Sequence, residues 1–236
     1  MWSNVVSVDK KFGKEFDFLV EKLSQMKNIS FAIEESSSRK FVYLASICEK
    51  QEEVEAQLFD VLYTEFLSFF KLRFILDRLH QTSFSFANCS LICSLLHFDR
   101  EYEKTTVQKV LSECLDYNLD GILTFRMSAL TDNWEELCSV ARHLIETSGG
   151  EEEMYDIATF ITGTEDNRSR LTISKNKIFN QTRRHNVEVV KLFDDDRWNF
   201  ISAIIEQHPT EIALENCNFS REMETTLRHL ARVVAI

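Results

Sequence analysis

A shortage of chain-breaking residues constrains this sequence more than any other feature. Its 236 residues include only five glycines and one proline. β-Sandwiches need turn residues about every 8–12 positions, and this chain cannot supply them. Phosphate-binding loops need glycines at fixed spacing, and no two of the five fit a GxGxxG or GxxxxGK[ST] pattern. The sequence therefore predicts a helix-rich fold without a glycine-rich nucleotide loop.

The charge balance is compatible with a soluble cytosolic protein. The 38 acidic residues outnumber the 27 basic ones, and a net charge of -11 opposes general attraction to nucleic acid or anionic membrane. The first nine residues, MWSNVVSVD, lack the pattern of a signal peptide, so we expect the six cysteines to be reduced. Charged residues interrupt the most apolar run, 61–79, so we expect no membrane span.

The first segment, residues 1–80, reads as an N-terminal βαββα unit. Periodic apolar residues favour helix where they recur every three or four positions and strand where they alternate. The predicted elements are a strand at 5–8, a helix over about 12–26, a hairpin of strands 29–33 and 41–47, and a helix over 52–79. The last helix is apolar on several faces in its second half, which predicts a central place in the core.

The middle segment, residues 81–163, is predicted to be entirely helical. Its helices are expected at 87–98, 105–117, 122–130, 134–147 and 151–161. Asp132 and Glu135 have the spacing of a capping box for the fourth of these helices.

The C-terminal segment, residues 164–236, reads as a hairpin followed by a βαβα unit. The hairpin strands are predicted at 170–174 and 177–182, and the unit as strand 187–193, helix 198–207, strand 211–215 and a final helix. Short links favour a right-handed crossover and a parallel pair of strands 187–193 and 211–215. The whole chain is therefore expected to be α+β, in three segments that either pack as one domain or stay separate.

Three stretches of sequence resemble one known family. The run DGILTFRM at 120–127 resembles the acidic–Gly–aromatic–x–x–Phe–Arg–Leu signature of the YtxC-like sporulation proteins of spore-forming Firmicutes. HFDRE at 97–101 and FISAIIEQHPTEI at 200–212 are similar to two further stretches of that family. Apolar Ile122 and Leu130 stand where the family has aromatic residues, which suggests a packing role. The resemblance implies a cytoplasmic protein linked to endospore formation and implies no reaction.

Two clusters contain residues of the types that bind metals. Cys89, Cys93 and His97 share one helix face, and Zn²⁺ accepts such ligands. Their apolar neighbours favour a buried helix, because structural zinc sites normally use short cysteine knuckles in loops. Asp194, Asp195 and Asp196 lie between a predicted strand and a predicted helix. They suit Mg²⁺ chemistry, but no lysine or glycine-rich loop completes a site, so helix capping is favoured.

Basic residues provide the candidate binding sites. Arg126 lies in an apolar helix, where we expect a structural bridge to Asp120 or Glu101, with anion binding as the alternative. Between Arg168 and Lys191 the chain has seven basic residues and one acid. The candidates in this basic segment are Arg168, Arg170, Lys175, Lys177, Arg183 and Arg184. A solvated hairpin, a protein contact and a nucleic-acid contact through phosphates all remain open here.

We therefore predict a protein without enzymatic activity or cofactor that acts through an unidentified protein partner. The prediction follows from the family resemblance and from the lack of a complete catalytic constellation in the sequence. Nucleic-acid binding through the basic segment is the alternative. Oligomeric state stays open.

Overall fold

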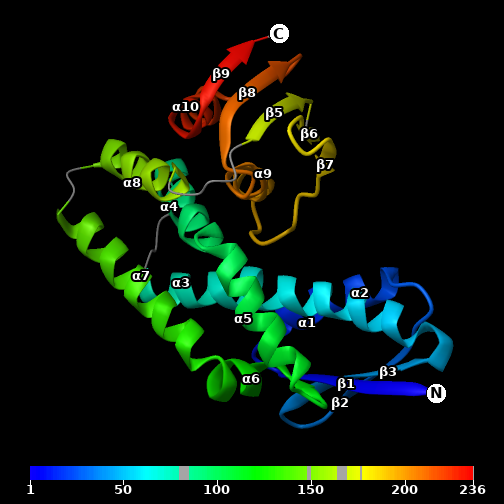
Figure 1. Cartoon of the computed structure of the whole chain (residues 1–236). Helices are drawn as coiled ribbons and strands as arrows, with labels where there is room; N and C mark the ends of the chain where they lie inside the picture. The colour runs from blue at the N-terminus through cyan, green and yellow to red at the C-terminus, as the bar shows by residue number, and fades with distance from the viewer. Residues whose placement is uncertain (80–84, 148–149, 164–168, 176, 236) are drawn as a thin grey trace. The chain divides into compact units, whose positions relative to one another are not determined.

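A computed structural model describes residues 1–79, 85–147, 150–163, 169–175 and 177–235. The fold is α+β, as the sequence predicts, with two mixed sheets among many helices (Figure 1). Contacts divide the chain into two compact units. Unit 1 comprises Met1–Arg73 and Arg100–Glu135, and unit 2 comprises Phe74–Asp99 and Glu136–Ile236.

Unit 1 contains a four-stranded sheet with the order β2-β3-β1-β4. Its strands are β1 (Trp2–Asp9), β2 (Ser30–Glu35), β3 (Arg39–Ser46) and β4 (Tyr117–Asn118). β3 runs antiparallel to both β2 and β1, which confirms the predicted hairpin. β4 adds to the other edge of β1 in parallel register, with Tyr117 beside Val6.

The helices of unit 1 cover one face of this sheet with apolar side chains. They are α1 (Gly13–Gln25), the short η1 (Cys48–Lys50), α2 (Gln51–Thr64), η2 (Glu65–Phe70), α5 (Arg100–Ser112) and α6 (Leu119–Arg126). α3 (Lys71–Leu79) and α7 (Ser128–Thr147) each cross the boundary between the units. The predicted helix over 52–79 is present, but its central part, η2, is π-helical and every one of its side chains is buried. This confirms the predicted central place in the core.

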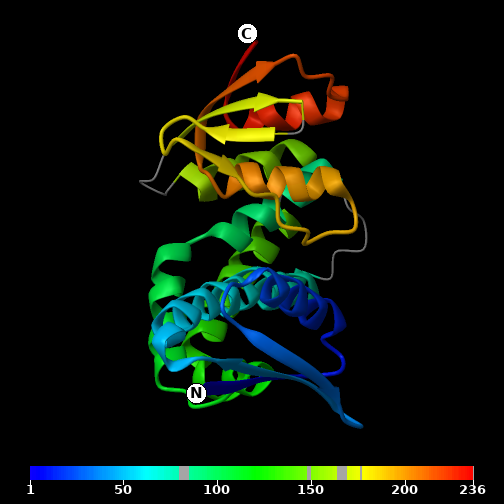
Figure 2. The ribbon, with the colours of Figure 1, turned by 90° about the vertical axis from the view of Figure 1, so that its right-hand side faces the viewer.

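Unit 2 contains a five-stranded sheet with the order β7-β6-β5-β8-β9. Its strands are β5 (Ser169–Ser174), β6 (Lys177–Asn180), β7 (His185–Val187), β8 (Pro209–Glu215) and β9 (Arg232–Ala235). β5, β6 and β7 form an antiparallel meander, whereas β8 joins β5, and β9 joins β8, in parallel. Figure 2 shows β5, β6 and β8 side by side. Leu171, Ile173, Ile178 and Ile212 make one face of this sheet apolar and buried.

Four helices complete unit 2. They are α4 (Phe86–His97), α8 (Glu151–Gly163), α9 (Asp196–Ile205) and α10 (Arg221–Leu230). α4 packs against α8, α9 and α10, while α10 also packs on β8 and β9. All of α4 after Phe86 is buried, which explains its nearly continuous apolar sequence.

Two elements near predicted helix starts differ from the sequence prediction. Residues 188–193 are not a strand: the Asn199 amide accepts the backbone N–H groups of Leu192 and Phe193 and donates to the Phe193 carbonyl. The parallel partner of β8 is therefore β5 and not the expected strand 187–193. The prediction of a capping box at Asp132 and Glu135 is also wrong, because α7 begins at Ser128 and Asp132 lies inside this helix.

The two units also differ from the three consecutive segments 1–80, 81–163 and 164–236. The helical middle divides between the units, since α5, β4 and α6 pack with the first sheet while α4 and α8 pack with α9 and α10. The middle is also not entirely helical, because β4 forms at Tyr117–Asn118. Prediction from local periodicity missed β4 and β9, both of which are short.

Candidate functional site

Asp120, the first residue of the DGILTFRM run, ties α6 to the sheet of unit 1. Its carboxylate accepts two hydrogen bonds from the Arg39 guanidinium, at 2.7 and 3.1 Å, and one from the Asp9 backbone N–H at 3.0 Å. Burial raises the pKa of Asp120, but the hydrogen bonds from Arg39 and Asp9 outweigh it and hold the pKa below its usual value. The acidic residue of the run therefore has a structural role.

Gly121 fits against the cap of α6. The Asn118 side chain caps this helix by accepting the Gly121 N–H at 3.1 Å. A Cβ atom at position 121 would lie 2.9 Å from Cγ of Asn118, closer than side chains tolerate. Further along the run and beyond it, Ile122 and Leu130 are buried, in line with the packing role inferred from the sequence.

Arg126 does not form the expected bridge. Asp120 is bound to Arg39, and within the described parts of the chain no carboxylate lies within ion-pair distance of Arg126. Arg126 is exposed, and its Nη1 lies 3.8 Å from the Cys114 sulfur. The end of α6 therefore adjoins the loop between α5 and β4.

Two large apolar side chains next to this contact in the sequence are exposed to solvent. Phe125 is 84% exposed and Leu115 is 91% exposed. Together with Arg126 they form what we call the α6 surface. Sequence reasoning missed it because a phenylalanine is placed in the core by default. No local signal marked it, because Phe125 follows buried Ile122 by three residues and lies only about 60° from it around an α-helix.

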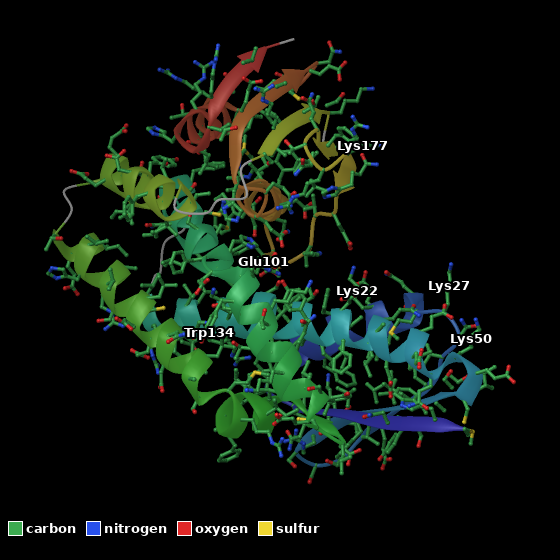
Figure 3. The ribbon with its side chains drawn as sticks, in the orientation of Figure 1. Lys22, Lys27, Lys50, Glu101, Trp134 and Lys177 are labelled. Carbon is green, nitrogen blue, oxygen red and sulfur yellow. The ribbon has the colours of Figure 1, made fainter. Side chains whose placement is uncertain are left out.

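The basic segment supplies β5, β6 and β7 to the sheet of unit 2, one face of which is buried, and its charges are spread over that sheet. Arg168 lies outside the described residues. Lys175 and Lys177 lie at the turn between β5 and β6, and Figure 3 labels Lys177. Arg183 and Arg184 lie beyond the opposite end of β6. All four are exposed, and none forms an ion pair with a described residue.

Arg170 lies in a face of mixed charge. Its cross-strand neighbour is Glu211, whose other neighbour is Arg232. Opposite charges in adjacent strand positions attract and partly cancel one another's field. The segment therefore does not present one continuous basic surface around Arg170.

The three aspartates lie at the start of α9. Asp195 is the cap: its carboxylate accepts the Arg197 N–H at 2.9 Å and binds the Arg197 guanidinium at 2.6 Å. Hydrogen bonding from Arg197 lowers the pKa of Asp195. Asp194 and Asp196 are exposed. Across the ranges that the structure describes, no three His, Cys, Asp or Glu side chains gather as metal ligands would.

Cys89, Cys93 and His97 lie in the core of unit 2. The two sulfurs are 3.9 Å apart, and burial raises the pKa of the Cys89 thiol well above its usual value. The His97 ring contacts Ser202, with Nε2 3.0 Å from the hydroxyl oxygen. His97 Nδ1 lies 4.0 Å from the Glu206 carboxylate. Ser202 and His97 are each only 3% exposed.

A groove that the sequence did not reveal lies where α4, α8, α9 and α10 begin. Its volume is about 430 Å³, within the range of ligand sites. Phe86, Tyr155 and Trp198 supply its aromatic walls, and Glu151, Glu152 and Glu222 supply carboxylates. We call it the N-terminal groove. No local motif signals it, because its lining comes from four separate stretches of sequence.

Comparison of the chain with models of known protein families, with curated proteins and with solved structures gives no match. Among the described residues, no helix combines the length and the apolar composition needed to cross a membrane.

Proposed function

We propose that this chain is a binding protein of the cytoplasm of spore-forming bacteria, and that it acts by contacting a partner protein rather than by catalysis. The resemblance of 97–101, 120–127 and 200–212 to YtxC-like sporulation proteins supports the cellular setting. The observation that carries the proposal is the α6 surface, where Phe125 and Leu115 are exposed next in sequence to the contacting residues Arg126 and Cys114.

The residues of the α6 surface are of the types that anchor protein interfaces. Burying a side chain such as Phe125 in a partner gains about 1.5–3 kcal/mol. Aromatic residues and arginine dominate the hot spots of protein interfaces. Arg126 has no carboxylate partner among the described residues. Arg126 is therefore available to pair with a carboxylate of the partner. We expect that carboxylate to lie beside an apolar pocket of the partner that accommodates Phe125.

The base of the α6 surface is held in place before any partner binds. Arg39 and Asp120 join the start of α6 to the sheet, and Asn118 caps the helix. Little conformational entropy is then lost when this surface docks, which favours affinity.

The accessibility of the reactive side chains supports a role without catalysis. The serine and histidine that contact each other, Ser202 and His97, are buried between α4 and α9. Asp195 is engaged by Arg197 at the start of α9. Neither group is presented to a substrate in the manner of a catalytic nucleophile or metal ligand.

Affinity purification from a lysate of sporulating cells tests the proposal. Tagged wild-type chain is compared with Phe125→Ser/Leu115→Ser, with and without nuclease, and recovered proteins are identified by mass spectrometry. We expect a near-stoichiometric partner that survives nuclease and whose yield from the double variant falls about tenfold or more. Phe160→Ser is the matched control, because Phe160 is 74% exposed in unit 2.

Two results would contradict the proposal. One is a partner that the double variant retains at the wild-type level. The other is recovered material that disappears with nuclease, which would favour nucleic acid and the basic segment instead. In that case binding should weaken steeply with salt and be lost in Arg183→Glu/Arg184→Glu.

A further inference from the structure

β2 is an open edge of the sheet in unit 1. Among the described strands the sheet edges are β2, β4, β7 and β9, and β2 is the longest of them, with six residues. It contains neither proline nor lysine, and its pairing with β3 has no bulge. Proteins usually protect a long edge strand with such features, because its unpaired N–H and C=O groups can pair with a further strand.

The hairpin between β2 and β3 determines which backbone groups of β2 are free. The Ser36 N–H donates to the Arg39 carbonyl at 2.9 Å. Hydrogen-bonded pairs alternate with non-bonded pairs along antiparallel strands, so every second residue of β2, counted back from Ser36, bonds to β3. The backbone groups of the residues between them, Phe31, Ile33 and Glu35, therefore point to the free edge.

The apolar face of the sheet continues to this edge. Phe31 and Ile33 pair with Leu44 and Val42 of β3, which are both buried. Cross-strand partners lie on the same face of a sheet, so all four side chains belong to the face that the helices of unit 1 cover. Ile33 is nevertheless 51% exposed. A further strand beside β2 would cover it.

Residues 30–34 have a pattern that is symmetrical about Ala32. Their sequence, SFAIE, has an apolar residue on each side of the alanine and a polar residue beyond each of these. A two-fold dimer requires a surface that is complementary to itself, and an antiparallel copy of this strand meets that requirement. The pattern therefore indicates a second copy of the chain as the occupant of the edge.

The acids of β2 do not oppose such a pairing. Lys10 forms an ion pair with Glu35 at 2.7 Å, and Glu34 forms a hydrogen bond with Tyr43 that raises the pKa of the tyrosine. Like charges destabilise a sheet when they lie directly opposite each other. Both acids lie at one end of β2, so the acids of two antiparallel strands lie at opposite ends of the pair.

We infer that two copies of this chain pair through their β2 strands, antiparallel, about a two-fold axis that passes beside Ala32. Phe31 of each copy then lies opposite Ile33 of the other, and the two residues exchange their free backbone hydrogen bonds. A register centred on Ile33 would place Glu35 against Phe31. A register shifted by one residue would place free groups opposite groups that already bond to β3.

The pairing joins the two sheets into one, with four strands from each copy. The helices of both copies then cover the same face, because the two-fold axis is perpendicular to the sheet. The α6 surface follows β4, at the opposite edge of the sheet from β2, so the dimer leaves it open. The inference therefore does not depend on the function proposed for that surface.

Sedimentation velocity of the full chain over about 1–100 μM tests the inference. We expect a concentration-dependent dimer that strengthens as salt rises, because two chains of charge -11 repel each other. Ile33→Pro removes an N–H at the free edge, where proline is tolerated, and should weaken the dimer about tenfold or more. Tyr102→Ser, at a side chain of α5 that is 53% exposed, is the control and should leave the dimer unchanged. Circular dichroism establishes that both variants are folded.

Cysteine crosslinking tests the register without disturbing the backbone. The exposed thiol of Cys48 is first removed as Cys48→Ser. In the proposed register, Ala32→Cys places two thiols directly opposite each other, whereas Glu34→Cys places each thiol opposite Ser30. Under mild oxidation, Ala32→Cys should form the disulfide-linked dimer about tenfold faster than Glu34→Cys.

Three outcomes would overturn the inference. A wild-type chain that stays monomeric over the whole concentration range would leave the edge to a strand of another protein. A dimer that Ile33→Pro leaves intact would have its interface elsewhere on the chain. Equal crosslinking of Ala32→Cys and Glu34→Cys would show that the strands do not pair about Ala32.

Discussion

Individual buried charges in unit 1 differ in how they are compensated. The Lys71 ammonium is fully buried and donates to Glu103 Oε1 at 2.7 Å, and the indole N–H of Trp134 (labelled in Figure 3) donates to the same oxygen at 2.7 Å. Glu65 in η2 is also fully buried, but neither of its oxygens has a hydrogen-bond partner among the described residues. Burial, with a smaller contribution from Glu15, raises the pKa of Glu65 well above its usual value.

Glu65 should make the protein less stable as pH rises. Because its pKa is higher in the folded state than in the unfolded state, the folded protein keeps a proton that the unfolded chain loses above about pH 4.5. The free energy of unfolding should then fall by up to about 1.4 kcal/mol per pH unit, until the pH passes the folded-state pKa. Urea denaturation at pH 5–8 gives the free energy of unfolding of wild type and of Glu65→Gln. The difference between these two free energies at each pH measures the contribution of Glu65.

Glu65→Gln should remove this part of the pH dependence, so its stability relative to wild type should increase with pH. Glu21→Gln, a change at an exposed acid of α1, provides the control and should follow the wild-type profile. Parallel profiles for wild type and Glu65→Gln would show that the Glu65 carboxyl is not desolvated in the folded state.

At the scale of elements, the start of α6 shows how a cap determines which residue can follow it. The capping Asn118 oxygen accepts the Gly121 N–H and also accepts a hydrogen bond from Arg39 at 2.6 Å. A methyl group at position 121 would displace this amide, and with it both hydrogen bonds. The start of α1 has no such constraint, because a Cβ on Gly13 would meet no atom within 4 Å.

The same substitution should therefore have opposite effects at these two glycines. Gly121→Ala should destabilise the protein by about 1–2 kcal/mol through loss of the cap. Gly13→Ala should stabilise it by about 0.4–1 kcal/mol, since alanine reduces the entropy of the unfolded chain. Thermal and urea unfolding of both variants measure the two changes. Equal effects of the same sign would contradict the proposed role of Asn118.

Sequence periodicity predicted the elements whose burial is regular along the chain. The stripe on α1 and the two hairpins alternate or repeat cleanly, so their hydrophobic pattern specifies them. Residues 188–193 are mostly apolar too, but the backbone groups of Leu192 and Phe193 bond to the Asn199 side chain, a partner that periodicity cannot reveal. β4 has two residues, too few for any pattern.

The candidate sites were harder to predict than the elements. The carboxylate expected for Arg126 binds Arg39 instead, a residue 81 positions away from Asp120 in the chain. Composition identified the basic segment. It could not reveal that Glu211 lies beside Arg170 and that Arg232 lies beside Glu211. The N-terminal groove depends on four helix starts coming together, which local sequence does not encode.

At the scale of the whole molecule, each unit is assembled from two separate stretches of chain. In unit 1, α5 carries Glu103, which is the ion-pair partner of Lys71. In unit 2, α4 packs against α8, α9 and α10. Segments that share a packed core usually open together in native-state exchange. Residues 1–73 and 100–135 should therefore behave as one cooperative unit, although other residues separate them in the chain.

Hydrogen exchange of two core variants tests this division. Lys71→Met leaves Glu103 buried without its ammonium partner, which costs about 3–5 kcal/mol. Exchange should accelerate together in 1–73 and 100–135 and much less in β5 and β8. Ile212→Ala, in the buried face of β8, should give the converse pattern with a cost of about 2–5 kcal/mol. Uniform acceleration by both variants would mean that the chain opens as a single unit.

The parallel pairing of β4 with β1 has a consequence for protein synthesis. The Asp9 N–H bonds to Asp120, 111 residues later, so at about 5–20 residues per second the ribosome needs on the order of ten seconds to supply that partner. During this time α2, η2 and α3 have emerged without α5 to cover Lys71 and the neighbouring phenylalanines. The nascent chain then exposes apolar helix to other chains and to chaperones. Recovery of folded protein should therefore depend on how quickly ribosomes translate residues 80–120.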